Sequence, residues 1–308
     1  MKKGIVILAE DYCPAWEKIF FEEKPHSVGF HFRPADYPME EYFARVGAPP
    51  LRRAAERLEN AGIAVEHELH AAEWLLPRVL FAKEPSLFRE EKGMRTPSLN
   101  YCFSDTRAAE IVSERAYLLA KTLKQSGNKY YIWSDDAENG LCSCAVCRKL
   151  NGADQAMLFA NAVLRGLRSY SSKAECSFLA YADALQVPSV PPAEGVFLEF
   201  APIYRDFAVP IEKNIGKNGA YRKLLAQLGG VFDTKNTQIL DYYLDISLQC
   251  GWKREKISEV TFCEDVLAAD VAYYEKRGIG IIKTFAAFAD FSYFQKYSDA
   301  PFRAFLRA

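Results

Sequence analysis

Short apolar runs that alternate with helical patterns are the feature that most limits how this chain can fold. Eight runs have the length and the β-branched or aromatic content of buried strands. They cover residues 4–8, 28–32, 63–68, 129–133, 177–181, 196–200, 238–243 and 280–285. Most of them are continuous rather than alternating, which is typical of parallel strands that are covered on both faces.

Helical patterns separate most of these runs. Apolar residues recur at helical spacing in residues 51–61, 108–125, 155–170, 221–228 and 264–276. Eight strands with intervening helices in 308 residues predict an α/β protein with one domain over residues 1–308, an irregular (β/α)8 TIM-type barrel. An open, doubly wound sheet is the alternative.

Two connections depart from the regular alternation. Residues 186–195, between the fifth and sixth strands, are rich in proline and leave no room for a helix, so this crossover helix should be missing or shortened. Residues 71–105 form a long segment between the third strand and its helix. Because long ordered loops usually have functions, we expect this segment to matter for the site.

Composition and charge exclude several classes of protein. The net charge is -1 and no basic stripe stands out, which argues against nucleic-acid binding. No stretch approaches the roughly 18 apolar residues of a membrane span, and the apolar run after the first four residues is too short for a signal peptide. We therefore expect a cytoplasmic protein without nucleic-acid or membrane partners, and the composition predicts no oligomeric state.

Charged and aromatic side chains recur where the predicted strands end, and the C-terminal strand ends carry the chemistry of such barrels. The candidates are Glu10, His31, Arg33, Glu66, His67, Trp133, Asp135, Asp136, Tyr181, Asp183, Glu199, Arg205, Asp241 and Tyr242. Buried charges are costly unless they are paired or used. Glycoside hydrolysis needs two carboxyl groups that flank the scissile bond, and aromatic faces suit sugar rings. The set therefore predicts an enzyme with a carbohydrate substrate.

The barrel register makes a geometric prediction for the carboxylates. Six of them should surround one mouth of the barrel, namely Glu10, Glu66, Asp136, Asp183, Glu199 and Asp241. Simpler roles remain open for single residues. Asp183 or Asp245 could cap a helix, His67 could be a hydrogen-bonded interior histidine, and Arg33 and Arg205 could pair with carboxylates.

Asp135 and Asp136 form the strongest acidic pair. Neighbouring residues in an extended chain point in opposite directions, so one can face the pocket while the other braces a loop or a second substrate group. The preceding strand is apolar and includes Trp133, so the surroundings of Asp136 can favour its protonated form.

Eight cysteines are present, and three of them form a Cys-x-Cys-x-x-Cys cluster directly after the fourth strand, at Cys142, Cys144 and Cys147. Structural zinc requires four tetrahedral ligands. Cys102 is the first candidate for the fourth ligand and His70 is the second. We expect one structural zinc ion and no organic cofactor, although three reduced cysteines that pack a loop would give the same pattern.

Residues 133–136 followed by residues 139–148 resemble the Asn-Asp…Gly-x-Cys-x-Cys-x-x-Cys segment of the domain-of-unknown-function 4838 family, which overlaps with glycoside hydrolase family 163. Further pieces in the same order resemble that family over roughly residues 28–285. They are residues 84–88, 93–95, 99–102, 159–161 and 181–183, and Arg205.

This resemblance implies a hexosaminidase-like barrel that acts on N-acetylhexosamine-containing glycans, in the manner of an N-acetylglucosaminidase. Such enzymes retain configuration by substrate assistance, with a paired acidic motif after the fourth strand. By resemblance, Asp135 would orient the acetamide of the substrate and Asp136 would protonate the leaving oxygen. Glu199 is a further catalytic candidate, and the remaining strand-end residues would bind substrate.

Two other functions stay open. One is a glucuronidase-like hydrolase, in which Glu199 and Asp241 form the carboxylate pair and Arg33 or Arg205 holds the uronate. The other is a sugar-binding barrel without catalytic activity, which would bind glycans and turn none of them over.

Overall fold

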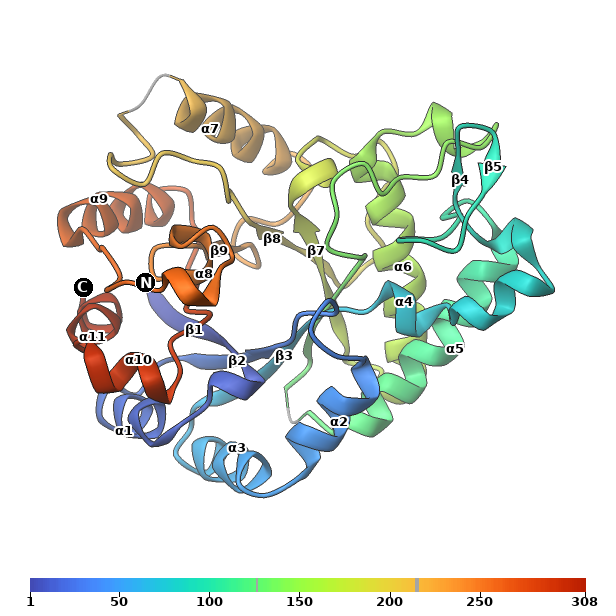
Figure 1. The fold of residues 1–308 in the computed structure, drawn as a ribbon. Coiled ribbons are helices and arrows are strands. Elements are labelled where there is room, and N and C mark those ends of the chain that lie inside the picture. Colours follow the sequence, from blue (N-terminus) through green and yellow to red (C-terminus); the bar gives the residue numbers. More distant parts are fainter. Residues whose placement is uncertain (126, 214–215) are drawn as a thin grey trace. The chain divides into compact units, whose positions relative to one another are not determined.

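The computed structural model describes residues 1–125, 127–213 and 216–308 (Figure 1). Eight strands form a closed parallel barrel with the hydrogen-bonded order β1-β10-β9-β8-β7-β6-β3-β2. The strands are β1 Lys2–Leu8, β2 Ser27–His31, β3 Ala64–His70, β6 Lys129–Trp133, β7 Glu175–Ala180, β8 Val196–Phe200, β9 Gln238–Asp241 and β10 Ile281–Phe285. The predicted (β/α)8 barrel is confirmed, and the open sheet is excluded because the strand order closes on itself.

The five predicted helices are all present, as α3, α5, α6, α7 and α9. The described α-helices are α1 Pro14–Glu23, α2 Met39–Gly47, α3 Leu51–Asn60, α4 Ala72–Leu75, α5 Thr106–Leu123, α6 Gly152–Tyr170, α7 Lys217–Leu228, α8 Ile246–Gln249, α9 Glu264–Glu275, α10 Phe291–Lys296 and α11 Ala300–Arg307. None of these described helices is long and apolar enough to cross a bilayer.

Short 3-10 helices and one small hairpin complete the structure. The 3-10 helices are η1 Ala9–Asp11, η2 Arg78–Ala82, η3 Pro85–Leu87, η4 Cys147–Lys149, η5 Ala182–Ala184 and η6 Arg254–Lys256. The hairpin pairs β4 (Glu90–Glu91) with β5 (Met94–Arg95) in antiparallel register. The long segment predicted between the third strand and its helix is therefore ordered, and it contains α4, η2, η3 and this hairpin.

The connection between β7 and β8 contains η5 but no α-helix, as the proline-rich sequence predicted. Side chains of α6 hold this connection. Asp154 accepts hydrogen bonds from the backbone N–H groups of Ser189 at 2.5 Å and Val190 at 2.8 Å. Asn161 accepts one from the Ala193 N–H at 2.8 Å. These side chains satisfy backbone groups that a crossover helix would satisfy internally.

Strand β9 ends at Asp241, two residues before the predicted end at Tyr243. The chain turns there because Asp245 starts α8. The Asp245 carboxylate accepts hydrogen bonds from the N–H groups of Ser247 at 3.0 Å and Leu248 at 3.4 Å. The simpler role considered for Asp245, that of a helix N-cap, is thereby confirmed.

The chain divides into two compact units. Unit 1 comprises Met1–Glu68, Phe200–Leu225 and Thr234–Ala308, and unit 2 comprises Leu69–Glu199 and Ala226–Asp233. In unit 1, Trp16 of α1 packs edge-on against Phe294 of α10, with ring centroids 5.3 Å apart, and against Phe302 of α11 at 4.9 Å. In unit 2, α5 and α6 lie side by side (Figure 1).

The inner face of the unit 1 strands carries a buried ion pair. Lys283 of β10 is fully buried, and its Nζ lies 2.7 Å from a carboxylate oxygen of Glu68 and 3.5 Å from one of Glu66. Two glycines make room for these side chains. A Cβ on Gly4 would lie 3.0 Å from Lys283 Cγ, and one on Gly29 would lie 2.7 Å from Glu68 Oε1. Pairing offsets the cost of burying these charges.

Candidate functional site

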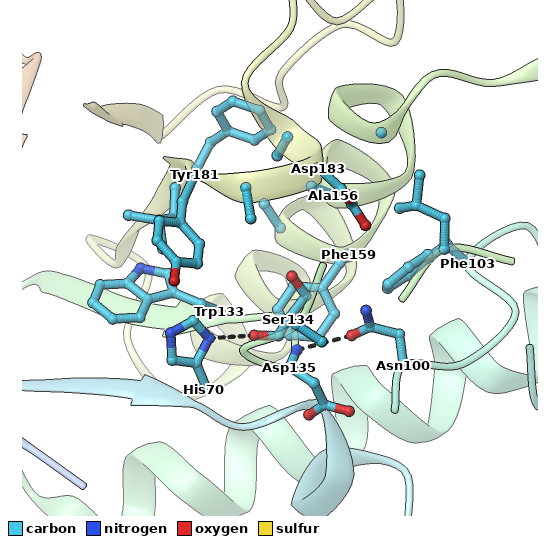
Figure 2. A pocket seen from close by; sticks show the side chains of 18 of the residues that line it. His70, Asn100, Phe103, Trp133, Ser134, Asp135, Ala156, Phe159, Tyr181 and Asp183 are labelled. Atoms are coloured by element: carbon cyan, nitrogen blue, oxygen red, sulfur yellow. Dashed lines mark hydrogen bonds between the residues drawn. The ribbon is translucent and has the colours of Figure 1, made fainter. Parts of the chain in front are cut away.

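Three ring side chains gather at strand ends of unit 2. His70 ends β3, Trp133 ends β6 and Tyr181 follows β7. The His70 ring centroid lies 5.0 Å from that of Trp133 and 6.2 Å from that of Tyr181. Figure 2 shows the three rings grouped together. Hydrogen bonds fix two of the rings: Trp133 Nε1 donates to Ser177 Oγ at 2.8 Å, and His70 Nδ1 bonds the Ser134 carbonyl. We refer to His70, Trp133 and Tyr181 as the aromatic triad.

Asp136 lies beside the aromatic triad. Its side chain is exposed, and its Oδ1 accepts a hydrogen bond of 3.0 Å from the Tyr181 hydroxyl. Three residues that the sequence singled out, Trp133, Asp136 and Tyr181, are therefore brought together. The arrangement places a solvent-accessible carboxylate next to the partly exposed ring of Tyr181, whereas Trp133 and His70 are buried.

Asp135 points away from the aromatic triad (Figure 2). Its carboxylate accepts a hydrogen bond from the Glu73 N–H at 3.0 Å and pairs with Arg78 at 2.7 Å. Its own N–H donates to Asn100 Oδ1 at 2.8 Å. Burial raises the pKa of Asp135, and Arg78 opposes that rise. Of the two acidic neighbours, Asp135 is thus the one that braces a loop, and its predicted role toward an acetamide stays a prediction.

Arg78 and Asn100 are site residues that the sequence did not reveal. Both belong to the long segment that follows β3, and they reach Asp135 from 57 and 35 residues away in the chain. Asn100 also donates to the Gly140 carbonyl at 3.2 Å, so it fixes the segment after β6 at two points. The length of the segment predicted a function without naming residues, and Asn100 lies within residues 99–102, which resemble the family, but neither signal assigned Arg78 or Asn100 a role.

Asp183 supports the same loop. Its carboxylate accepts a hydrogen bond of 3.1 Å from the Gly140 N–H. The turn that presents it is tight, because Ala182 has a φ of 45° in the left-handed region. Gly152 allows this turn to approach α6, since a Cβ there would lie 1.9 Å from the Asp183 carbonyl oxygen. Asp183 therefore supports the loop after β6 rather than capping a helix, and its predicted role toward substrate stays a prediction.

A cavity of about 40 Å³ is lined by the aromatic triad together with Asp135 and Asp183, and Asp136 is not among its lining residues. A space of this size holds water molecules, whereas small-molecule sites measure about 300–1,000 Å³. A sugar would therefore have to bind outside this cavity.

Glu199 occupies β8 and is fully buried. It shares a strand face with Phe197, whose ring lies 5.6 Å from that of Tyr131. Its predicted catalytic role stays a prediction, and substrate would have to reach a side chain that has no exposed surface here.

The strand ends of unit 1 hold several further predicted residues. Glu10 accepts a 2.6 Å hydrogen bond from the Tyr37 hydroxyl. The His31 ring lies 5.2 Å from that of Phe285, which also stacks on Tyr242 at 5.5 Å. These contacts leave Glu10 tied to a neighbouring loop and place His31 and Tyr242 against the same ring.

Arg33 is enclosed by aromatic rings rather than by carboxylates alone. Its guanidinium lies 5.6 Å from the Trp252 ring centroid and 5.5 Å from that of Phe288, and 3.4 Å from an Asp36 carboxylate oxygen. The pairing role that the sequence left open for Arg33 is thus present, and the Trp252 ring beside it remains partly exposed.

Tyr242 lines a second cavity, of about 420 Å³, together with Phe207, Gln249 and Phe262. This volume lies in the range of small-molecule sites. Its aromatic walls are compatible with the predicted substrate role of Tyr242, which stays a prediction.

Asp11, the neighbour of Glu10, is a strand-end carboxylate of unit 1 that was not among the predicted site residues. It is almost fully buried, accepts a 2.6 Å hydrogen bond from the Phe288 N–H and lies 3.4 Å from Arg254. Burial raises the pKa of Asp11 to about 7, although Arg254 lowers it. Its position after β1 was visible in the sequence, but its burial depends on partners far along the chain.

Arg205 and Asp241 do not form an open binding surface. Both side chains are fully buried, 3.2 Å apart, and Arg205 also pairs with Asp270 of α9 at 2.7 Å. Both were predicted to bind substrate, and the strand register explains why Asp241 is buried instead. Asp241 is level with Thr284, whereas the inner-face Lys283 is level with Leu240, so Asp241 faces the helices. Asp241 is therefore not part of the predicted ring of mouth carboxylates.

His67 also faces the helices. Its Nδ1 bonds the hydroxyl of Tyr42 on α2 at 2.6 Å, on the opposite face of β3 from Glu66 and Glu68. Burial lowers the pKa of His67 to about 4, so the ring is neutral near pH 7. This placement corresponds to the interior histidine that the sequence left open, and it moves His67 away from a substrate.

The four predicted cysteines come together in unit 2. Cys102, Cys142, Cys144 and Cys147 are buried, and their sulfur atoms all lie within 4.8 Å of one another. Cys102 Sγ lies 3.7 Å from that of Cys144 and 3.8 Å from that of Cys147, too far for disulfides. His70, the other candidate for the fourth ligand, belongs to the aromatic triad instead.

Comparison with known proteins connects this chain with one family. Residues 29–252 match the family described as a domain of unknown function, DUF4838. The chain belongs to this family. Comparison with curated proteins gives no match.

Solved structures share the fold of this DUF4838 chain. It is similar to a beta-N-acetylhexosaminidase from Bacteroides fragilis NCTC 9343, with a TM-score of 0.52 and 13% identity over 92% of this chain and 60% of that one. It thus spans less than two thirds of the hexosaminidase. A broad-specificity GH5-4 endoglucanase from an uncultured bacterium gives 0.56 and 10% over 96% of this chain and 84% of that one. The cellulose synthase subunit Z of Clostridioides difficile gives 0.53 and 12% over 100% and 98%. At these identities the likeness shows the barrel fold alone.

Proposed function

We propose that this DUF4838 chain is a glycoside hydrolase that acts on glycans containing N-acetylhexosamine. The observation that carries the proposal is the exposed Asp136 carboxylate, held 3.0 Å from the Tyr181 hydroxyl beside the Trp133 ring. A carboxyl group at a strand end can protonate a glycosidic oxygen, while neighbouring rings bind the sugar. The hexosaminidase and endoglucanase barrels that share its fold support a carbohydrate substrate.

In the proposed reaction the substrate supplies its own nucleophile. The acetamide oxygen attacks the anomeric carbon while Asp136 gives a proton to the leaving oxygen. Asp136 then accepts a proton from the water that opens the cyclised intermediate, so configuration is retained. The Tyr181 hydroxyl donates to Asp136, which stabilises the carboxylate left after the first proton transfer. No second protein carboxylate has to reach the anomeric carbon.

Asp135 has a supporting role that does not depend on the acetamide. By bonding the Glu73 N–H and Arg78, it fixes the segment that carries Asp136. To orient an acetamide as well, Asp135 would have to exchange one of these bonds for the substrate N–H. The glucuronidase-like alternative receives no support from Arg205 and Asp241, because these two side chains form a buried ion pair with each other.

The decisive experiment compares two substrates that differ in leaving group. A panel of chromogenic glycosides first identifies an accepted sugar. Asp136→Asn should then lower turnover by about 10²–10⁴ on a glycoside with a poor leaving group, because that step needs a proton donor. The loss should be far smaller on an activated aryl glycoside. Glu110→Gln, an exposed carboxylate change on α5, is the matched control and should leave both rates unchanged.

Two further variants separate the competing assignments. A thiazoline analogue of the cyclised intermediate should inhibit the wild type if the acetamide is the nucleophile, and Asp135→Asn should then slow both substrates. If Asp136→Asn leaves both rates untouched while Glu199→Gln abolishes both, the acid is not Asp136. Glycan binding without turnover of any glycoside would instead favour the non-catalytic barrel.

A further inference from the structure

We infer that Cys102, Cys142, Cys144 and Cys147 bind one structural zinc ion, which ties the segment before α5 to the loop after β6. This inference concerns a site that the proposed hydrolase reaction does not use, and it stands whether or not the chain is a hydrolase. We refer to the four residues as the cysteine cluster.

The spacing of the sulfur atoms fits a tetrahedral metal site. Four thiolates at the usual Zn–S distance of about 2.3 Å lie about 3.8 Å apart along each edge of a regular tetrahedron. In the cysteine cluster, Cys102 Sγ lies 3.7 Å from Cys144 Sγ and 3.8 Å from Cys147 Sγ, and all four sulfur atoms lie within 4.8 Å of one another. Tetrahedral sites built from four thiolates are typical of zinc or iron.

The surroundings of the sulfur atoms suit thiolates better than thiols. Backbone N–H groups donate to two of them, from Glu90 to Cys142 Sγ at 3.3 Å and from Cys147 to Cys144 Sγ at 3.5 Å. Arg95 brings a positive charge to 4.0 Å from Cys142 Sγ. Hydrogen-bond donors and a cation stabilise negative sulfur, which four thiols packed as hydrophobic side chains would not need.

Other cysteines of the described chain give a useful contrast. Cys13, Cys176 and Cys250 are buried as well, but none of them is part of the cysteine cluster. They match the small, buried, apolar role that is usual for a free cysteine. Burial by itself therefore does not bring four cysteines to one point in this fold.

The position of the cluster indicates what the metal does. Cys102 precedes α5, whereas the other three cysteines follow β6, so one ion would join segments about 40 residues apart in the chain. The β4–β5 hairpin contacts the cysteine segment as well. Ser143 donates to the Glu90 carbonyl from its N–H at 2.8 Å and from its hydroxyl at 2.7 Å. Asn100, two residues before Cys102, bonds the Asp135 N–H. Four protein thiolates leave no open position for water, so the ion would be structural.

Elemental analysis of the full chain tests the inference directly. Protein purified without added metal and without a metal-affinity tag should contain about one zinc ion per chain. Growth with cobalt should give the intense visible absorption of tetrahedral Co²⁺ bound to thiolates. Wild-type protein that contains no zinc and gives no such absorption would overturn the inference, and one iron ion per chain would overturn the choice of metal.

Variants show whether the cluster is the site and whether the ion locks the loops. The double substitution Cys142→Ala and Cys147→Ala should reduce zinc to the level of the blank, whereas the matched control Cys176→Ala should retain all of it. Removing zinc from the wild type with a thiol reagent and chelator should speed proteolytic cleavage within residues 84–105. Zinc that persists in the double variant would place the metal elsewhere. An unchanged rate of cleavage after zinc removal would refute the claim that the ion holds residues 84–105 in place. Both readouts are independent of glycosidase activity.

Discussion

Asp136 and Asp241 both stand at the C-terminal end of a barrel strand, yet their surroundings are opposite. Asp136 is exposed and bonds the Tyr181 hydroxyl, whereas Asp241 is fully buried and bonds Arg205. Asp136 lies three residues beyond the end of β6, in the following loop, whereas Asp241 is the last residue of β9. Asp241 faces the helices, where a charge has to be paired internally. A carboxylate at a strand end is therefore a candidate for the site only when it is exposed and is not already paired with a buried cation.

Two groups of residues express this contrast. The first is the Asp135–Asp136 segment of unit 2, which combines a brace with an exposed acid. The second comprises the outer-face strand residues His67 and Asp241 of unit 1, together with Arg205 and Asp270, which form an ion-pair network with Asp241. Stability should depend strongly on the second group and weakly on Asp136.

The largest effect is expected from Arg205→Met. This change leaves Asp241 and Asp270 buried without their cation, so the free energy of unfolding should fall by about 3–5 kcal/mol. Denaturant unfolding measures it. The matched control is Arg107→Met, which breaks an exposed pair with Glu110 and should cost about 0–1 kcal/mol. Equal losses of unfolding free energy in the two variants would mean that the buried Arg205 network stabilises the fold no more than the exposed pair does.

His67 should make stability depend on pH. Burial lowers its pKa from 6.5 to about 4, so the unfolded chain binds the proton first as the pH falls. The contribution of His67 is complete above pH 6.5 and is lost as the pH falls toward 4. By linkage this amounts to about 3 kcal/mol. His67→Gln should therefore lose less unfolding free energy than the wild type between pH 6.5 and 4. Parallel curves for the two proteins would contradict a buried neutral His67.

A smaller effect is expected from Arg78→Met. Arg78 and Asp135 are only partly buried, so loss of their pair should cost about 1–2 kcal/mol of unfolding free energy. If Asp135 is a brace, Arg78→Met and Asp135→Asn should cost less together than the sum of the single changes. A double-mutant cycle measures this coupling. Full additivity would show that Asp135 does not depend on Arg78.

The smallest effect is expected from Asp136→Asn. Its exposed side chain loses little when the charge is removed, so the unfolding free energy should stay within about 0.5 kcal/mol of the wild type. A loss comparable to that of Arg205→Met would show that Asp136 is a structural residue. A stable but catalytically impaired variant would support its role as the exposed acid.

The architecture could be predicted from local sequence patterns. Eight apolar runs with helical patterns between them predicted the barrel, and the proline-rich residues 186–195 predicted the missing crossover helix, because both signals are local. The pairing of a brace with an exposed acid at Asp135 and Asp136 also followed from local geometry, since neighbours in an extended chain point in opposite directions. The spacing of Cys142, Cys144 and Cys147 also predicted that these three cysteines lie together, because they fall within six residues of one another.

Which face of a strand each polar residue occupies could not be predicted from the sequence and depends on how the strands pack. A strand buried on both sides has no alternation of polar and apolar residues, so nothing local distinguishes the outer-face His67 and Asp241 from inner-face residues. The partners that settle their roles are remote in the chain. Tyr42 meets His67 across 25 residues, Arg205 meets Asp241 across 36, and Arg78 meets Asp135 across 57. Burial and pairing are properties of these contacts, and they arise only when the chain folds.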